Sequence, residues 1–524
     1  MWLFALAILV LPKTAQATAL PPSELVDQVR NANHVFNAIH SSMRQWGSSI
    51  YHNGMSFFPA LVPAGIQFYH GNPNQEPVQG LEWLAFEPEH AIIFARRLHR
   101  PYEAVLPQMG EETEFTNQLG FGRITSSAQK AAKFSLNSVT ESYDRHSMPE
   151  RPDIPQVHPG WLHTYRTKEA TPLLYIDGMS AGKCDKGTLD SQDVLLLNAS
   201  VGGGGMLWER KRANGLCKLA HERWNGKIKG FIRMEAGFEI IMCSFSDSLD
   251  FVQSVRAGQF SLGGATSDSS EKGFDWAIWK WIKFIASRYD GIGGRRVRLD
   301  YDHFFTAYTY DFDLFSGKTD LPRLQNISAE ALDRARDDVD RMVRSWDPLN
   351  ILDEKSPVDW QSIADMVVER YAGVLKYLLG GTLTKVEDLL EELELILRVF
   401  IDSDARNKTA EVDRCVAQFN PGEGRISTSI VGNSIQAVTR EICETLFAAF
   451  DVDVTLSQAM DKLRSLTEYL NWSVWKKCPQ CAFNEVCFIP MWPFGTAEDR
   501  EHPRCRNSSE LSRRMGYWGN PRSR

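Results

Sequence analysis

The chain has 524 residues, of which 43% are hydrophobic and 24% are charged, and its 58 basic and 66 acidic residues give a net charge of −8. This composition is typical of a globular protein, and the length predicts two to four domains. A nucleic-acid surface needs a basic stripe, so the mild acidity argues against a nucleic-acid partner.

The first segment has the pattern of an export signal. Residues 2–11 form an apolar run that is too short to span a bilayer, although no basic residue precedes it. Small residues at Ala15, Ala17 and Ala19 then offer two cleavage sites. We therefore expect residues 1–19 to be a signal peptide. No later run approaches a membrane span, so the sequence predicts a secreted protein.

Asparagine triplets and cysteines agree with export. Five N-x-S/T triplets lack proline, which predicts a glycoprotein, although chance alone supplies two or three. Nine cysteines in an oxidising compartment should mostly pair, and the odd number leaves one free, expected in the first of three groups. The triplets begin at Asn198, Asn326, Asn407, Asn471 and Asn507. The cysteine groups are Cys184, Cys217 and Cys243; Cys415 and Cys443; and Cys478, Cys481, Cys487 and Cys505.

The last cysteine group allows two interpretations. Cys478-Pro-Gln-Cys481 has the spacing of zinc ligands. Secretion favours disulfides over zinc, so we predict two disulfides here and no metal. Four cysteines allow three connectivities, and the sequence leaves these open.

The N-terminal part predicts a helix followed by a strand, turn, strand and helix. Apolar residues recur at helical spacing before two prolines break the chain. A histidine at the end of a buried strand, facing a helix start, suits a ligand contact; the alternative is a simple turn cap. The predicted elements are a helix within 21–52, a break at Pro59 and Pro63, strands at 66–69 and 83–86 around a turn at His70-Gly71, and a helix from Pro88.

Strands and helices continue after a long polar insertion. Two local motifs within this part predict no ligand site. The run from Gly178 to Lys183 resembles a phosphate-binding loop, but its glycines are one residue too close. Asp300 and Asp302 are expected to be solvated rather than to bind a metal. The predicted elements are an insertion at 101–159, strands at 161–166, 172–177, 230–243 (split at Gly237), 297–301 and 304–312, and helices at 207–224 and 274–289.

After Pro322 the pattern becomes almost entirely helical. Amphipathic helices are predicted at 328–346, 358–379, 383–401, 430–450 and 456–470. The fold class is therefore α+β: an N-terminal mixed-sheet domain (20–320), an all-α helical bundle (321–471) and a short disulfide-rich C-terminal tail (472–524). The tail is too small for a core of its own, so it should be stapled and laid against another domain.

Three short motifs resemble those of ADP-ribosyltransferases. Tyr69-His70-Gly71 is similar to the first motif of that family, in which the first strand carries His or Arg. Trp83 to Phe86 and the helix after it resemble the second strand, although the family's Tyr or Ser is missing. Glu239, or Glu235, would match the catalytic glutamate. The resemblance implies NAD as substrate.

The resemblance implies a role for each residue. Breaking the nicotinamide–ribose bond develops positive charge on the sugar, which Glu239 would stabilise. His70, with Tyr69 and Gly71, would hold the other ribose, and Trp83 would stack on a ring. The alternative is that Glu235 and Glu239 are strand-edge carboxylates or pair with Arg233.

The whole chain also resembles secreted fungal proteins of unassigned function, through stretches such as Tyr-Ile-Asp-Gly-Met-Ser-Ala-Gly and Arg-Met-Glu-Ala-Gly-Phe-Glu-Ile. We therefore predict a secreted glycoprotein, with an ADP-ribosyltransferase-like enzyme or effector as the leading hypothesis. One alternative is a non-catalytic protein that binds a protein or small-molecule partner. Another is an accessory protein of a fungal secondary-metabolite pathway.

Overall fold

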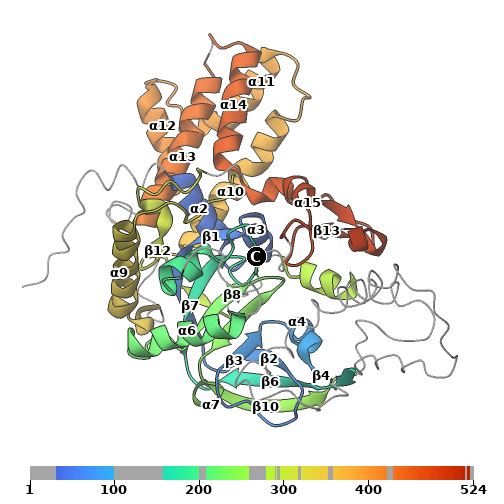
Figure 1. Cartoon of the computed structure of the whole chain (residues 1–524). Coiled ribbons are helices and arrows are strands. Elements are labelled where there is room, and N and C mark those ends of the chain that lie inside the picture. Colours follow the sequence, from blue (N-terminus) through green and yellow to red (C-terminus); the bar gives the residue numbers. More distant parts are fainter. Residues whose placement is uncertain are drawn as a thin grey trace, which may run out of the picture.

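The computed structural model describes residues 31–98, 157–199, 208–258, 279–289, 291, 296–316, 320–351, 358–421, 429–451, 453–513 and 516–519. A large sheet occupies one half of the molecule and a layer of helices the other, with the C-terminal tail beside them (Figure 1). This arrangement confirms the predicted α+β class. The signal peptide and nearly all of the 101–159 insertion lie outside the described residues.

The sheet has ten strands in the order β10-β6-β2-β3-β9-β8-β7-β1-β11, with β12 also pairing β1. Neighbours are antiparallel except β7 and β8. The strands are β1 (Asn53–Val62), β2 (Gln67–Asn72), β3 (Glu82–Ala85), β6 (Trp161–Thr167), β7 (Thr171–Gly178), β8 (Gly230–Met234), β9 (Phe238–Met242), β10 (Leu249–Arg256), β11 (Arg298–Leu299) and β12 (Phe305–Thr306). Two further pairs join β4 (Arg96–Leu98) to β5 (Val157–Pro159) and β13 (Val486–Phe488) to β14 (Arg504–Arg506).

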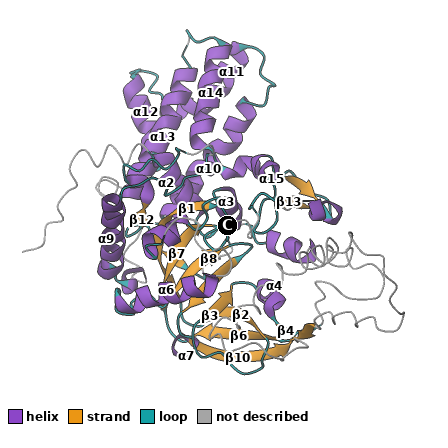
Figure 2. Ribbon diagram, in the orientation of Figure 1, coloured by secondary structure: helices purple, strands orange, loops and turns teal. Residues whose placement is uncertain are grey.

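Most helices coincide with the predicted ones (Figure 2). Side-chain caps fix several starts: Ser328 accepts from Ala331 N, and Thr455 forms a capping box with Gln458. The helices are α2 (Ala32–Ser41), α3 (Gln45–Ile50), α4 (Pro88–Ala91), α6 (Glu209–Glu222), α7 (Phe245–Ser248), α9 (Ala329–Ser345), α10 (Trp360–Leu378), α11 (Val386–Leu397), α12 (Lys408–Ala417), α13 (Ile430–Ala449), α14 (Leu456–Leu470) and α15 (Ala497–Glu501). Shorter turns are the π-helix η3 (Ser191–Leu196) and the 3-10 helices η1 (Ile92–Phe94), η5 (Ala307–Thr309), η6 (Pro348–Ile351), η7 (Arg398–Phe400), η8 (Ser473–Lys476) and η9 (Ser508–Arg513).

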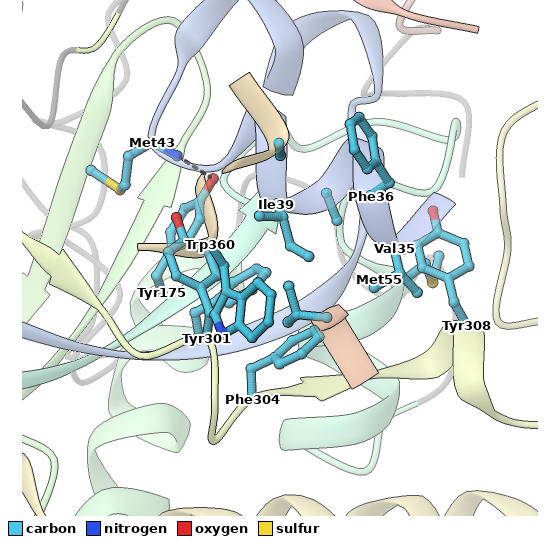
Figure 3. Close-up of a cluster of buried hydrophobic side chains, with 14 of the residues drawn as sticks. Val35, Phe36, Ile39, Met43, Met55, Tyr175, Tyr301, Phe304, Tyr308 and Trp360 are labelled. Carbon is cyan, nitrogen blue, oxygen red and sulfur yellow. Dashed lines mark hydrogen bonds between the residues drawn. The ribbon is translucent and has the colours of Figure 1, made fainter. Parts of the chain in front are cut away.

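One hydrophobic core joins the sheet to the helices. The N-terminal helix α2 packs against α13 and α10 rather than remaining with the strands that follow it in sequence. Its buried side chains Val35, Phe36 and Ile39 face aromatic residues such as Tyr301 and Trp360 (Figure 3). The apolar face of α2 is therefore buried against helices of the C-terminal bundle.

Three predictions about local structure were wrong. Pro59 does not break the chain, because it lies within β1, whose ten residues are all buried. His70 does not begin a turn, because β2 continues to Asn72. Asp300 and Asp302 are not merely solvated, because they accept hydrogen bonds from the indoles of Trp346 (3.0 Å) and Trp360 (2.8 Å).

The tail is stapled as predicted and packs against the sheet domain. Its disulfides join Cys478 to Cys487 and Cys481 to Cys505. The Trp492 indole donates to the carbonyl oxygen of Lys183 at 3.2 Å, and the Arg500 guanidinium donates to Ile50 O at 3.2 Å. The other disulfides are Cys217–Cys243 and Cys415–Cys443, which leaves Cys184 as the free thiol in the expected group.

Candidate functional site

Strands β2, β3 and β9, which carry the predicted site residues, are adjacent in the sheet. Tyr69 pairs with Ala85, and Ala85 pairs with Glu239. Residues opposite each other on neighbouring strands point to the same face, and successive residues of one strand alternate. Tyr69 and Glu239 therefore share a face, whereas His70 points to the other one. The structure does not bring His70 and Glu239 together.

His70 has a structural environment of its own. Its Nδ1–H donates to the carbonyl oxygen of Trp83 at 2.7 Å. Its ring lies against Phe245 and His163, at centroid distances of 5.6 and 6.1 Å. Burial lowers the pKa of His70 to about 4, so the ring is neutral at physiological pH.

The residues predicted to bind the cofactor are also engaged by the protein. A side chain at Gly71 would overlap the backbone of Ala91 and Phe94, so the turn after α4 covers this position. Trp83 lies under the guanidinium of Arg210, 5.6 Å from the ring centroid. The Arg210 contact covers one face of the Trp83 ring, and the turn after α4 covers Gly71.

The two predicted glutamates belong to a buried charge cluster, which we call the polar centre: Lys183, Glu209, Arg233, Glu235 and Glu239. Arg233 is fully buried and pairs with Glu209 and Glu239, as one interpretation of the sequence expected for Glu239. Lys183 donates to Glu235 at 2.7 Å and lies 3.7 Å from Glu209. Strands β8 and β9, α6 and the loop after β7 thus each contribute a charge.

Burial and neighbouring charges shift the pKa values of two carboxyl groups of the polar centre in opposite directions. Burial raises the pKa of Glu235 to about 7, and nearby Glu239 adds to this rise against the opposing effect of Lys183. Burial would also raise the pKa of Glu209, but Arg233 and Lys183 overcome it and lower the pKa to about 2. Two cations face three carboxyls, so the centre has one carboxyl in excess. Glu235 is the group that takes up a proton near neutral pH.

A narrow recess lies beside the polar centre, between α4, α3 and the β8–β9 turn. Its enclosed space is about 10 Å³, enough for a single water-sized group. Its lining residues are Gln45, Glu87, Glu89, His90, Gly237, Phe238, Phe284, Ile285 and Arg288. We call it the His90 recess.

Three buried polar atoms of the His90 recess have no hydrogen-bond partner among the residues that the structure describes: His90 Nδ1, Gln45 Oε1 and Glu89 Oε2. Burial lowers the pKa of His90, so the ring is neutral and one of its two nitrogens can accept a hydrogen bond. Nδ1 lies against Gly237, where a Cβ atom would come within 2.7 Å of it. The recess therefore presents three polar atoms that a ligand could bind, in a space that a side chain at Gly237 would reduce.

The sequence did not point to Lys183, Glu209 or His90 as site residues. Lys183 stands in the loop that resembles a phosphate-binding motif, and its ammonium group pairs with Glu209 and Glu235. Arg233 carried the available signal, as a charge inside the apolar run Phe-Ile-Arg-Met of a buried strand.

Fold and site define an α+β protein with a buried charge cluster and a disulfide-stapled tail. Residues 24–262 match the family model of the YPL277C N-terminal domain. The uncharacterized protein YOR389W of Saccharomyces cerevisiae is 25% identical over an alignment of 559 residues, which covers 90% of this chain and 84% of that protein. The uncharacterized protein YPL277C of the same yeast is 30% identical over 260 residues, 47% of this chain and 48% of that protein.

No solved structure matches this chain. The similarities support the predicted uncharacterised fungal family, and they assign no activity. Among the described residues, no helix has the length and apolarity that a transmembrane span requires.

Proposed function

We propose that this is an exported protein that binds a small molecule at the mouth of the His90 recess, with one amine or hydroxyl group of that molecule inside the recess, and transfers a proton through the polar centre. The observation that carries the proposal is the group of buried polar atoms in the recess that have no partner among the described residues. A buried polar atom without a partner costs about 1–3 kcal/mol, so a donor group that reaches these atoms recovers that energy on binding.

The recess and the polar centre are electrostatically connected. The charges of Glu239 and Lys183 both act on the pKa of His90. Glu235 is the acid–base group, because its pKa of about 7 lets it accept or donate a proton near neutral pH. Lys183 holds the Glu235 carboxylate through the 2.7 Å bond, and Glu239 is held by Arg233.

Export is supported by the chemistry of the chain. Four disulfides are compatible with an oxidising compartment, in agreement with the predicted signal peptide. Asn198, Asn326 and Asn407 are exposed, so three of the five sequons are open to glycosylation.

The experiment combines binding and turnover. Purified protein is mixed with a panel of small amines, amino alcohols and polyols, and both ligand binding and product formation are followed by NMR. We expect binding by the parent, loss of binding in His90→Phe, and retained binding without turnover in Glu235→Gln. His221→Phe, an exposed histidine of α6, is the matched control. Circular dichroism and disulfide mapping check that each variant folds.

Absence of binding throughout the panel would refute the recess as a ligand site. Turnover that survives Glu235→Gln would refute the proton-transfer role. A parallel arm with labelled NAD tests the hypothesis based on the ADP-ribosyltransferase resemblance. NAD turnover that depends on Glu239 would replace our proposal, although His70 lies on the other face of the sheet from Glu239.

The second candidate is a non-catalytic binding protein, and one feature of the sheet favours it. β10 pairs only with β6 in the described part of the chain, and three apolar side chains along it are 38–53% exposed: Phe251, Val252 and Val255. Such an edge suits an extended apolar peptide that adds a strand. Peptide-array binding that a Val255→Lys variant abolishes, without any recess ligand, would favour this function over the first.

A further inference from the structure

The four cysteines of the tail form one sulfur cluster rather than two separate pairs. Strands β13 and β14 are antiparallel, and their register places Cys487 directly opposite Cys505. The disulfide partners of these two residues, Cys478 and Cys481, come from the Cys-Pro-Gln-Cys turn that precedes β13. The hairpin and the turn therefore bring the sulfur atoms of Cys478, Cys481 and Cys505 together, and Cys487 adjoins them through its bond to Cys478.

The spacing of this cluster is close to that of a zinc site. The sulfur atoms of Cys478, Cys481 and Cys505 all lie within 4.8 Å of one another. Zinc bound at about 2.3 Å to each of four thiolates would hold the sulfurs about 3.8 Å apart. Cys487 is bonded to Cys478 and supplies the fourth sulfur.

The immediate surroundings also suit thiolates. The backbone N–H of Cys478 donates to Cys487 Sγ at 3.1 Å, and such a bond stabilises negative charge on sulfur. All four cysteines are partly exposed, so a reductant and a metal ion both have access. In contrast, Cys415 and Cys443 are fully buried between α12 and α13.

We propose that the tail is a thiol–disulfide switch: oxidised, it has two disulfides, and reduced, it binds one zinc ion through Cys478, Cys481, Cys487 and Cys505. Each disulfide takes two electrons and two protons from a dithiol, which itself becomes a disulfide. The thiols then release their protons as zinc binds. Both states hold the Cys-Pro-Gln-Cys turn on the β13–β14 hairpin, so the tail keeps its place against the sheet domain.

The test measures zinc on the full-length protein in both redox states. One sample is reduced under native conditions with excess dithiothreitol, supplied with zinc and freed of excess metal by gel filtration. A second is produced in a reducing cytosol with zinc in the medium, which avoids any need to refold. We expect about one zinc per chain in both reduced samples and none in the oxidised protein. Cobalt substitution should give the absorption of tetrahedral thiolate ligands.

Two matched double variants locate the metal. Cys481→Ser with Cys505→Ser removes one tail pair and should abolish zinc binding. Cys415→Ser with Cys443→Ser removes the buried pair and should leave zinc binding unchanged. The proposal would be overturned if the first variant retained zinc. It would also be overturned if both reduced parent samples lacked zinc while thiol titration found all four tail cysteines reduced.

Discussion

Replacement of Arg233 by methionine tests the energetics of the polar centre. The guanidinium is fully buried, pairs with Glu209 and Glu239, and donates to Gln192 at 3.0 Å. Methionine fills similar space without charge, so Glu239 loses the cation that pairs with it, and Glu209 keeps Lys183 at 3.7 Å. Breaking a buried pair in this way costs about 3–5 kcal/mol.

The lowered pKa of Glu209 gives a second value for this loss of stability and predicts how the loss depends on pH. A carboxyl whose pKa falls from 4.5 in the unfolded chain to about 2 in the folded protein contributes about 3 kcal/mol above pH 4.5. Because the folded pKa is depressed, this contribution is lost as pH falls from about 4.5 through 2. At pH 3 roughly 1.5 kcal/mol remains.

Urea unfolding at pH 7 and pH 3, with disulfides intact, measures the effect. Arg233→Met should be about 3 kcal/mol less stable than the parent at pH 7, and the difference should roughly halve at pH 3. Arg464→Met, which removes an exposed ion pair with Asp461, should cost less than about 1 kcal/mol at both pH values. A cost for Arg233→Met below that of this control, or one independent of pH, would refute the reasoning.

Three further predictions follow from single contacts. Glu235→Gln should gain stability relative to the parent between pH 5 and 8 in thermal unfolding, because the raised pKa of Glu235 makes its ionisation costly; parallel profiles would contradict this. Mass spectrometry of protein secreted from yeast should find glycans on the exposed Asn198 and Asn326 more often than on the partly buried Asn471; equal occupancy would contradict burial as the determinant. Asp300→Asn should cost about 1–3 kcal/mol in urea unfolding at pH 7, because Asp300 accepts from the Trp346 indole, from His303 and from two backbone N–H groups; a cost below about 0.5 kcal/mol would contradict that role.

The sequence predicted elements well where periodicity was strong. The helices of the C-terminal part and the strands around Gly237 follow from apolar spacing and from a glycine turn. Two of the elements that the sequence did not predict have a physical explanation. β10 has exposed apolar residues on an edge, so it lacks a clean alternation. α12 is short, and its burial depends on a disulfide to α13.

The candidate site was predictable only in part. Glu235 and Glu239 were identified, and their placement on adjacent segments of a hairpin followed from the Gly237 turn. Their partners come from distant segments: Lys183 from the loop after β7 and Glu209 from the start of α6. No local sequence pattern specifies which distant charged residues pair in a sheet protein, because the order of the strands determines which segments become neighbours.

The separation of His70 from Glu239 is a property of the register, and the register is fixed by neighbouring residues. A slip of one residue in β2 would turn His70 to the Glu239 face. The same slip would move Phe68 out of its contact with Phe86, at a centroid distance of 5.1 Å. It would also replace Gly71, whose position tolerates no side chain beneath the turn after α4, with a residue that carries one. Each change would destabilise the fold by more than one histidine contact could stabilise it. Chemistry on the Glu239 face must therefore use His90 from the covering helix α4 instead of His70 from the sheet.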